Sequence, residues 1–154
     1  MIHFQRSLII DATPDAVWHE LRRFMNIDEF APQVTSVDAL TEGEITVGSK
    51  RRCHFQDGNS MAEEVVQWQE NEGYRVKLFE TEPMPIKEAF AEISLAPVAP
   101  GKTNVVWSMD CILKYGPIGW LIGQTLMKGM MGKVLDANLN GLATKVLAGR
   151  KTAA

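Results

Sequence analysis

Residues 117–147 read PIGWLIGQTLMKGMMGKVLDANLNGLATKVL and predict one long helix at the end of a chain whose other segments mostly predict strands. About thirty helical residues at a rise of ~1.5 Å each would extend about 45 Å. A sheet of roughly six or seven strands spaced ~4.8 Å apart is about 30 Å wide, so the helix can cross all of it. One helix is too narrow to fill the concave face of such a sheet. The remaining space must hold bulky side chains, the short N-terminal helices or a ligand.

Turn signals divide the rest of the chain into short segments. Residues 1–10 predict an opening strand, and Thr13-Pro14-Asp15 predicts the start of a helix that runs to about residue 23. Residues 24–30 predict a second short helix that ends before Pro32. Further strands are predicted at 34–41, 46–56, 61–69, 74–82, 86–96 and 103–114. The turns between them are short, which predicts an antiparallel meander in an α+β fold. We expect residues 1–154 to form a single domain, because no linker or repeat interrupts the pattern.

Composition and charge argue against several classes of function and indicate the cellular compartment. The formal net charge is −3, which argues against a general binder of nucleic acids or anionic membranes. Gln124, Lys128 and Lys133 interrupt the apolar C-terminal stretch, so we expect no stable membrane insertion. The first residues lack the pattern of a signal peptide, and Cys53 and Cys111 fall within predicted strands, as expected for reduced thiols. We therefore expect a cytoplasmic protein, either a monomer or a homodimer.

Strand alternation predicts which side chains face the helix. The inward set contains several alanines, two cysteines and few large aliphatic residues, so the inner face lacks the volume of a filled core. We therefore predict a cavity of roughly 300–1,000 Å³ between the sheet and residues 127–134. The methionines and tryptophans there could form an adaptable wall for a ligand or simply fill the core. The predicted walls include Cys53, Phe55, Val66, Trp68, Leu78, Ala91, Trp107, Met109, Met127, Met130 and Met131.

Polar residues are also predicted on the inner face. If the hairpin closes at the Asp-Gly-Asn turn, Cys53 falls opposite Glu64. Arg51 then falls opposite Val66 and lies diagonal to Glu64, within reach of its carboxylate. The two charges would need each other as partners, directly or through water, and would form the polar end of the cavity. Tyr74 could add a hydroxyl. The alternative is that both charged residues reach solvent at the mouth of the sheet.

Glycines mark two features of the long helix. The apolar side chains before Gly129 and after Gly132 fall on different faces, so we predict a kink or a loosened turn between these glycines. Gly119 and Gly123 form a GxxxG pattern, which outside a membrane predicts close packing of the helix on the sheet.

No pattern of catalytic or metal-ligating residues stands out. His3, His19 and His54 lie on different predicted elements without the spacing of a zinc site. The chain has neither a Gly-rich phosphate loop nor a paired-cysteine motif. We expect no metal and no cofactor, and we assign no catalytic residue.

A family resemblance rests on several pieces that occur in a fixed order. They are IIDATPDAVW at 9–18, Val47-Gly48 through Arg51 to Asp57-Gly58, Glu64-Val65-Val66, Pro85-Ile86 with 91–97, and Thr103 to Trp107-Ser108. The chain resembles the START-like, or Bet v 1-like (SRPBCC), superfamily and, within it, the polyketide cyclase/dehydrase-like group. The resemblance implies a helix-grip fold: a curved antiparallel sheet of about seven strands wrapped around a long C-terminal helix, with two short helices after the first strand. It also implies binding of lipids, sterols, polyketides or other hydrophobic molecules, which some such proteins cyclise or dehydrate.

Three functions follow as expectations. The first is to bind, and so carry or sequester, a small hydrophobic molecule in the cavity. The alternative is a cyclase or dehydratase acting on an aromatic or polyketide-like substrate, which a buried acid/base residue with a shifted pKa would favour. The second alternative is a protein-interaction or chaperone-like module, which a shallow filled groove and an exposed apolar patch would favour. None of the three uses a nucleic acid as partner.

Overall fold

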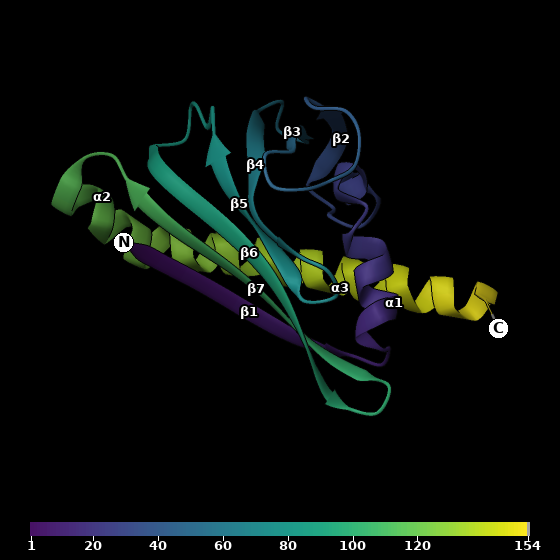
Figure 1. The fold of residues 1–154 in the computed structure, drawn as a ribbon. Coiled ribbons are helices and arrows are strands. Elements are labelled where there is room, and N and C mark those ends of the chain that lie inside the picture. The colour runs from purple at the N-terminus through teal and green to yellow at the C-terminus, as the bar shows by residue number, and fades with distance from the viewer. Residues whose placement is uncertain (154) are drawn as a thin grey trace.

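The chain folds into a seven-stranded antiparallel sheet that curves around a long C-terminal helix (Figure 1). The computed structural model describes residues 1–153, except for the side chains of residues 125, 126 and 150–153. The strands are β1 (Ile2–Ile10), β2 (Val34–Ala39), β3 (Lys50–Phe55), β4 (Ser60–Gln69), β5 (Gly73–Phe79), β6 (Ile86–Ala99) and β7 (Lys102–Leu113). They are arranged in the order β1-β7-β6-β5-β4-β3-β2. The predicted α+β helix-grip fold is confirmed.

Two short helices follow β1, as predicted: the α-helix α1 (Pro14–Leu21) and the 3₁₀ helix η1 (Phe24–Glu29). The Thr13 side chain accepts a hydrogen bond from the Ala16 N–H at 3.3 Å, and Pro14 occupies the first helical turn. Both features stabilise the start of α1, because they use or remove N–H groups that have no partner within the helix.

The C-terminal helical region has three segments: α2 (Gly116–Ile122), the π-helical turn η2 (Gly123–Met127) and α3 (Lys128–Ala153). The kink predicted between Gly129 and Gly132 is wrong in position, because the irregular turn comes before Lys128. A π turn holds more residues than an α turn, so it rotates the side chains that follow it. This rotation explains why the apolar residues of the region fall on two different faces.

The β3–β4 hairpin closes more tightly than the sequence predicts. The Phe55 N–H donates to the Asn59 carbonyl at 2.9 Å, which sets the register of the hairpin. Arg51 therefore lies opposite Glu63, and the predicted pairing of Arg51 with Val66 is wrong. The register differs by an odd number of residues, so the other side chains of β4 turn toward the helix.

Glu63 is consequently the buried carboxylate beside Arg51. Glu64 was predicted to take this place, but it is only partly buried and lies outside the cavity described below. The predicted pairing of Cys53 with Glu64 is also wrong, since Cys53 lies opposite Met61. Alternation alone did not reveal the register because two consecutive glutamates fit either face.

A β-bulge in β4 is the second feature that changes which side chains lie on the inner face of the sheet. The pairing with β5 shifts between Val65 and Gln67, and Val66 falls out of the alternation. The predicted inward position of Val66 is therefore wrong. Trp68 returns to the inner face, where it lies opposite Tyr74.

The core is filled toward α1 and the C-terminal half of α3. The rings of Trp18 and Trp68 pack with centroids 5.0 Å apart, and Trp68 stacks on Tyr74 at 5.4 Å. A Cβ atom at Gly141 would lie 1.9 Å from the Phe30 carbonyl oxygen, so only glycine lets α3 approach this segment so closely. Buried aliphatic residues along α3 complete the core: Leu135, Leu139, Leu142 and Val146.

Candidate functional site

A cavity of about 490 Å³ lies between the inner face of the sheet and the N-terminal half of α3. Its volume falls within the ~300–1,000 Å³ of typical small-molecule sites, so the predicted cavity is present. The walls are mainly apolar, and their helical side is a stripe that recurs every three or four residues. The stripe consists of Met127, Met131, Val134 and Asn138.

Most of the predicted site residues line this cavity. They are Arg51, Cys53, Phe55, Tyr74, Leu78, Ala91, Trp107, Met109, Met127, Met130 and Met131. The prediction fails for Glu64 and Val66, which the hairpin register and the bulge remove from the cavity wall. It also fails for Trp68, which packs on Trp18 and donates its indole N–H to Glu70 Oε1 at 3.3 Å.

Sequence reasoning missed several cavity residues. Met61 and Glu63 were hidden by the hairpin register. Asn138 lies one helical turn after Val134, so the helical period would have found it had polar residues been considered. Residues in turns or on partly exposed surfaces carry no periodic signal; among them are Gln33, Asp57, Asn59 and Lys133.

Arg51 is the central polar residue of the cavity, with a side chain that is 2% exposed. Its Nε donates to Glu63 Oε2 at 2.6 Å, and its Nη2 lies 2.5 Å from the same oxygen. Nη1 donates to the backbone carbonyl of Phe24, and the guanidinium lies 3.9 Å from the centroid of the Phe24 ring. The pair is therefore neutral as a whole and fixed by contacts from β3, β4 and η1.

Burial and this ion pair set the protonation states around Arg51. Burial lowers the pKa of Arg51, but the Glu63 carboxylate, together with Tyr74 and Cys53, outweighs burial and raises the pKa above its ordinary value. Burial raises the pKa of Cys53 to about 12 and also raises the pKa of the Tyr74 hydroxyl. At neutral pH the thiol and the phenol are therefore uncharged. Cys53 lacks the thiolate of a nucleophile, and Tyr74 keeps a proton that it can donate in a hydrogen bond.

Asn138 adds a polar group to the helical wall of the cavity. The residue is 8% exposed, and Oδ1 has no hydrogen-bond partner in the described part of the chain. An unpaired buried carbonyl oxygen is unfavourable by roughly 1–3 kcal/mol. The oxygen therefore favours a donor, such as a hydroxyl or an N–H, inside the cavity.

The cavity reaches the surface between the β3–β4 turn and α3. Asp57 on the turn and Lys133 on α3 both line it and are exposed. Met130 also lines the cavity and is 67% exposed. Among the described residues, no cluster of His, Cys, Asp and Glu is placed to hold a metal ion. None of the described helices combines the length and the apolar character needed to cross a membrane.

The chain belongs to the family described as polyketide cyclase / dehydrase and lipid transport, whose model matches residues 1–147. The protein with this cavity between sheet and helix is therefore a member of that family. Among curated proteins, no sequence matches the chain.

Solved structures resemble this fold over nearly its whole length. Protein XoxI from Bacillus cereus is 20% identical, with 96% of each chain covered and a TM-score of 0.76. The Zhui aromatase/cyclase from Streptomyces sp. R1128 is 18% identical, with 94% of this chain and 92% of that chain covered and a TM-score of 0.70. Norcoclaurine synthase from Thalictrum flavum, a point mutant in complex with a transition-state analogue, is 15% identical; 96% of this chain and 95% of that chain are covered, with a TM-score of 0.75. At these identities the likeness establishes the fold alone.

Proposed function

We propose that this protein binds a small, mainly apolar molecule in the cavity and carries or sequesters it in the cytoplasm. The observation that carries the proposal is the 490 Å³ cavity, whose walls are mainly apolar, with a few buried polar groups inside and exposed polar residues at the surface. Sites of this size and character bind small molecules by excluding water and fix their orientation through few polar contacts. The two buried, free cysteines support a reducing compartment.

The polar groups favour a ligand with a neutral oxygen-containing group. Glu63 already neutralises Arg51, so the cavity has no uncompensated positive charge there for a carboxylate. The Tyr74 hydroxyl is available as a donor, and Asn138 Oδ1 as an acceptor. A ligand hydroxyl or carbonyl would suit these groups, while the methionines adapt to an irregular hydrocarbon skeleton.

A titration with the neutral fluorescent probe N-phenyl-1-naphthylamine tests the proposal. Ala91→Trp should abolish probe binding, because Ala91 lines the cavity and the indole would occupy its space. Ala39→Trp is the matched control, since Ala39 lies exposed on β2. Probe binding that is equal in the Ala91→Trp variant and in the wild type would contradict a cavity site.

The enzyme alternative draws on the family and on the Arg51–Glu63–Tyr74 group. Among the described residues that line the cavity there is no histidine, so proton transfer by a buried group would fall to Tyr74 or Glu63. If the protein is a cyclase or dehydratase, Tyr74→Phe should abolish turnover of an aromatic polyketide-like substrate and leave its binding within about threefold. Binding without turnover in the wild type would favour the carrier.

A further inference from the structure

Helix α2 contacts the sheet through its glycine side and turns its large apolar residues outward. A Cβ atom at Gly119 would lie 2.1 Å from the Lys114 carbonyl oxygen and 3.3 Å from Leu113 Cβ at the end of β7. One at Gly123, the first residue of η2, would lie 1.9 Å from Ile2 Cδ1 on β1. The GxxxG pattern thus serves close packing on the sheet, as predicted. The residues between and around the glycines form what we call the α2 surface: Tyr115, Ile118, Trp120, Leu121 and Ile122, all of them exposed.

This orientation is the reverse of the usual one for a surface helix. Amphipathic helices of globular proteins bury their large apolar residues and expose the polar ones. On α2 the exposed fractions of Ile118 and Trp120 are 70% and 51%. Adjacent exposed apolar residues of this size mark a surface that contacts a partner or a membrane.

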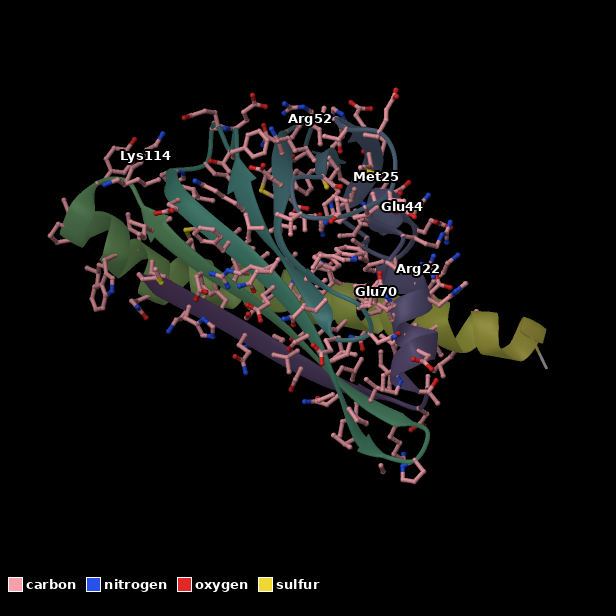
Figure 2. All side chains as sticks on the ribbon, in the orientation of Figure 1. Arg22, Met25, Glu44, Arg52, Glu70 and Lys114 are labelled. Atoms are coloured by element: carbon pink, nitrogen blue, oxygen red, sulfur yellow. The ribbon has the colours of Figure 1, made fainter. Side chains whose placement is uncertain are left out.

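The segment of the chain that carries the α2 surface has only positive charges. No acidic residue occurs between Asp110 and Asp136, a stretch that contains Lys114, Lys128 and Lys133, although the whole chain has a net charge of −3. Lys114 lies at the end of the molecule that carries α2 (Figure 2), where it pairs with Glu82 at 2.8 Å. Lys128 is exposed at the start of α3. Glu82 compensates Lys114, so the exposed charge of Lys128 is what complements an anionic surface.

In the sequence, the residues of the α2 surface come directly before residues that line the cavity. η2 follows α2 directly, and Met127 at its end lines the cavity. Met130, one turn later, lines the cavity and is largely exposed. Met130 follows Ile122 by eight residues, which corresponds to a helical rise of about 12 Å. A partner bound to the α2 surface would therefore lie within about 12 Å of this part of the cavity wall.

We propose that the α2 surface docks the protein on an anionic lipid bilayer. Tryptophan and tyrosine favour the membrane interface, and lysines beside an apolar helix face add attraction to anionic headgroups. A helix of this length lies in the interface and does not span it. A second copy of the chain fits less well, because a two-fold contact through α2 would bring the same lysines together. Where the cavity function also holds, the ligand would pass between bilayer and cavity past Met130.

Vesicle flotation of the full chain tests this docking. The protein should float with vesicles of phosphatidylcholine that contain about a quarter phosphatidylglycerol, and less with phosphatidylcholine alone. Salt at about 0.5 M should weaken the binding by screening the lysines. The double variant Ile118→Ser/Trp120→Ser should lose at least about tenfold in affinity, because it removes apolar area from the interface. Lys128→Glu should weaken binding to the anionic vesicles only.

Matched controls distinguish binding through the α2 surface from nonspecific binding through other apolar or charged residues. Val47→Ser/Val98→Ser removes two apolar residues that are 58% and 51% exposed elsewhere, and Lys77→Glu reverses an exposed charge on β5. Neither should change flotation. Docking is overturned if the Ile118/Trp120 variant floats like the wild type, or if that variant loses a dimer that the wild type forms without vesicles. Binding of N-phenyl-1-naphthylamine in the same variant reports on the cavity separately, so either proposal can fail alone.

Discussion

Arg51 and Glu63 stabilise each other inside the protein, and neither is suited to burial alone. The pair lies directly across β3 and β4 with both side chains almost fully buried. Two charges removed from water are tolerated only when each satisfies the other. The sequence predicted an inward Arg51 with a carboxylate partner, but it could not choose between two consecutive glutamates.

Arg51→Met should therefore lower the free energy of unfolding by about 3–5 kcal/mol, because it leaves the Glu63 carboxylate buried without a partner. Urea unfolding measures this change. The double variant Arg51→Met/Glu63→Leu should regain most of the loss. Equal urea midpoints for the single and double variants would mean that the two residues are not coupled.

Asn138 offers the opposite case, a polar residue whose removal should stabilise the ligand-free protein. Its Oδ1 has no partner in the described part of the chain, so Asn138→Leu should raise the free energy of unfolding by about 1 kcal/mol. The same change should weaken binding of a hydroxylated ligand more than binding of a plain hydrocarbon. A destabilised variant, or equal loss for both ligands, would show that the amide serves the scaffold.

At the scale of elements, local signals predicted the strands and helices well. Turn residues mark the strand ends, and Thr13-Pro14 marks the start of α1. Three features escaped prediction because they depend on tertiary packing: the tight β3–β4 turn, the bulge at Val66 and the π turn η2. Each adds or removes a residue within a periodic pattern, which leaves composition unchanged but moves the side chains to another face.

Two glycines of the C-terminal region should respond in opposite ways to alanine. Nothing lies within 4 Å of a Cβ atom at Gly129, so Gly129→Ala should raise the free energy of unfolding by about 0.5–1 kcal/mol through helix propensity. Gly123→Ala should lower it, because the new methyl group would collide with Ile2. Urea unfolding of both variants measures these changes in the free energy of unfolding. A gain at Gly123 would contradict the close contact between the helical region and β1.

The β1–β7 pairing contains a pH-dependent contact. His3 Nδ1 lies 2.6 Å from Asp110 Oδ1, and this hydrogen bond raises the pKa of His3 above its ordinary value. The contribution to stability is therefore full below about pH 6.5 and is lost as the pH rises through the higher folded-state pKa. The stability advantage of the wild type over His3→Gln should shrink between about pH 6 and pH 8 in urea unfolding. An advantage that stays constant or grows over this range would contradict the assignment.

At the scale of the whole molecule, the cavity follows from side-chain volume. The sequence places small residues such as Ala91 and Cys53 on the inner face, and a single helix cannot fill the concave side of the sheet. This reasoning predicted the location of the cavity and most of its walls. It did not predict the mouth, because turns have no periodic pattern, and it missed Asn138 because only the apolar residues of the helix were considered.

Native mass spectrometry of gently purified protein tests the central claim, that the cavity holds a small molecule. The wild type should carry a bound species of small-molecule mass that collisional activation releases, and Ala91→Trp prepared in the same way should carry none. The Ala39→Trp control should behave like the wild type. A wild-type spectrum that shows only the mass of the chain, or the same adduct on Ala91→Trp, would contradict ligand binding in the cavity.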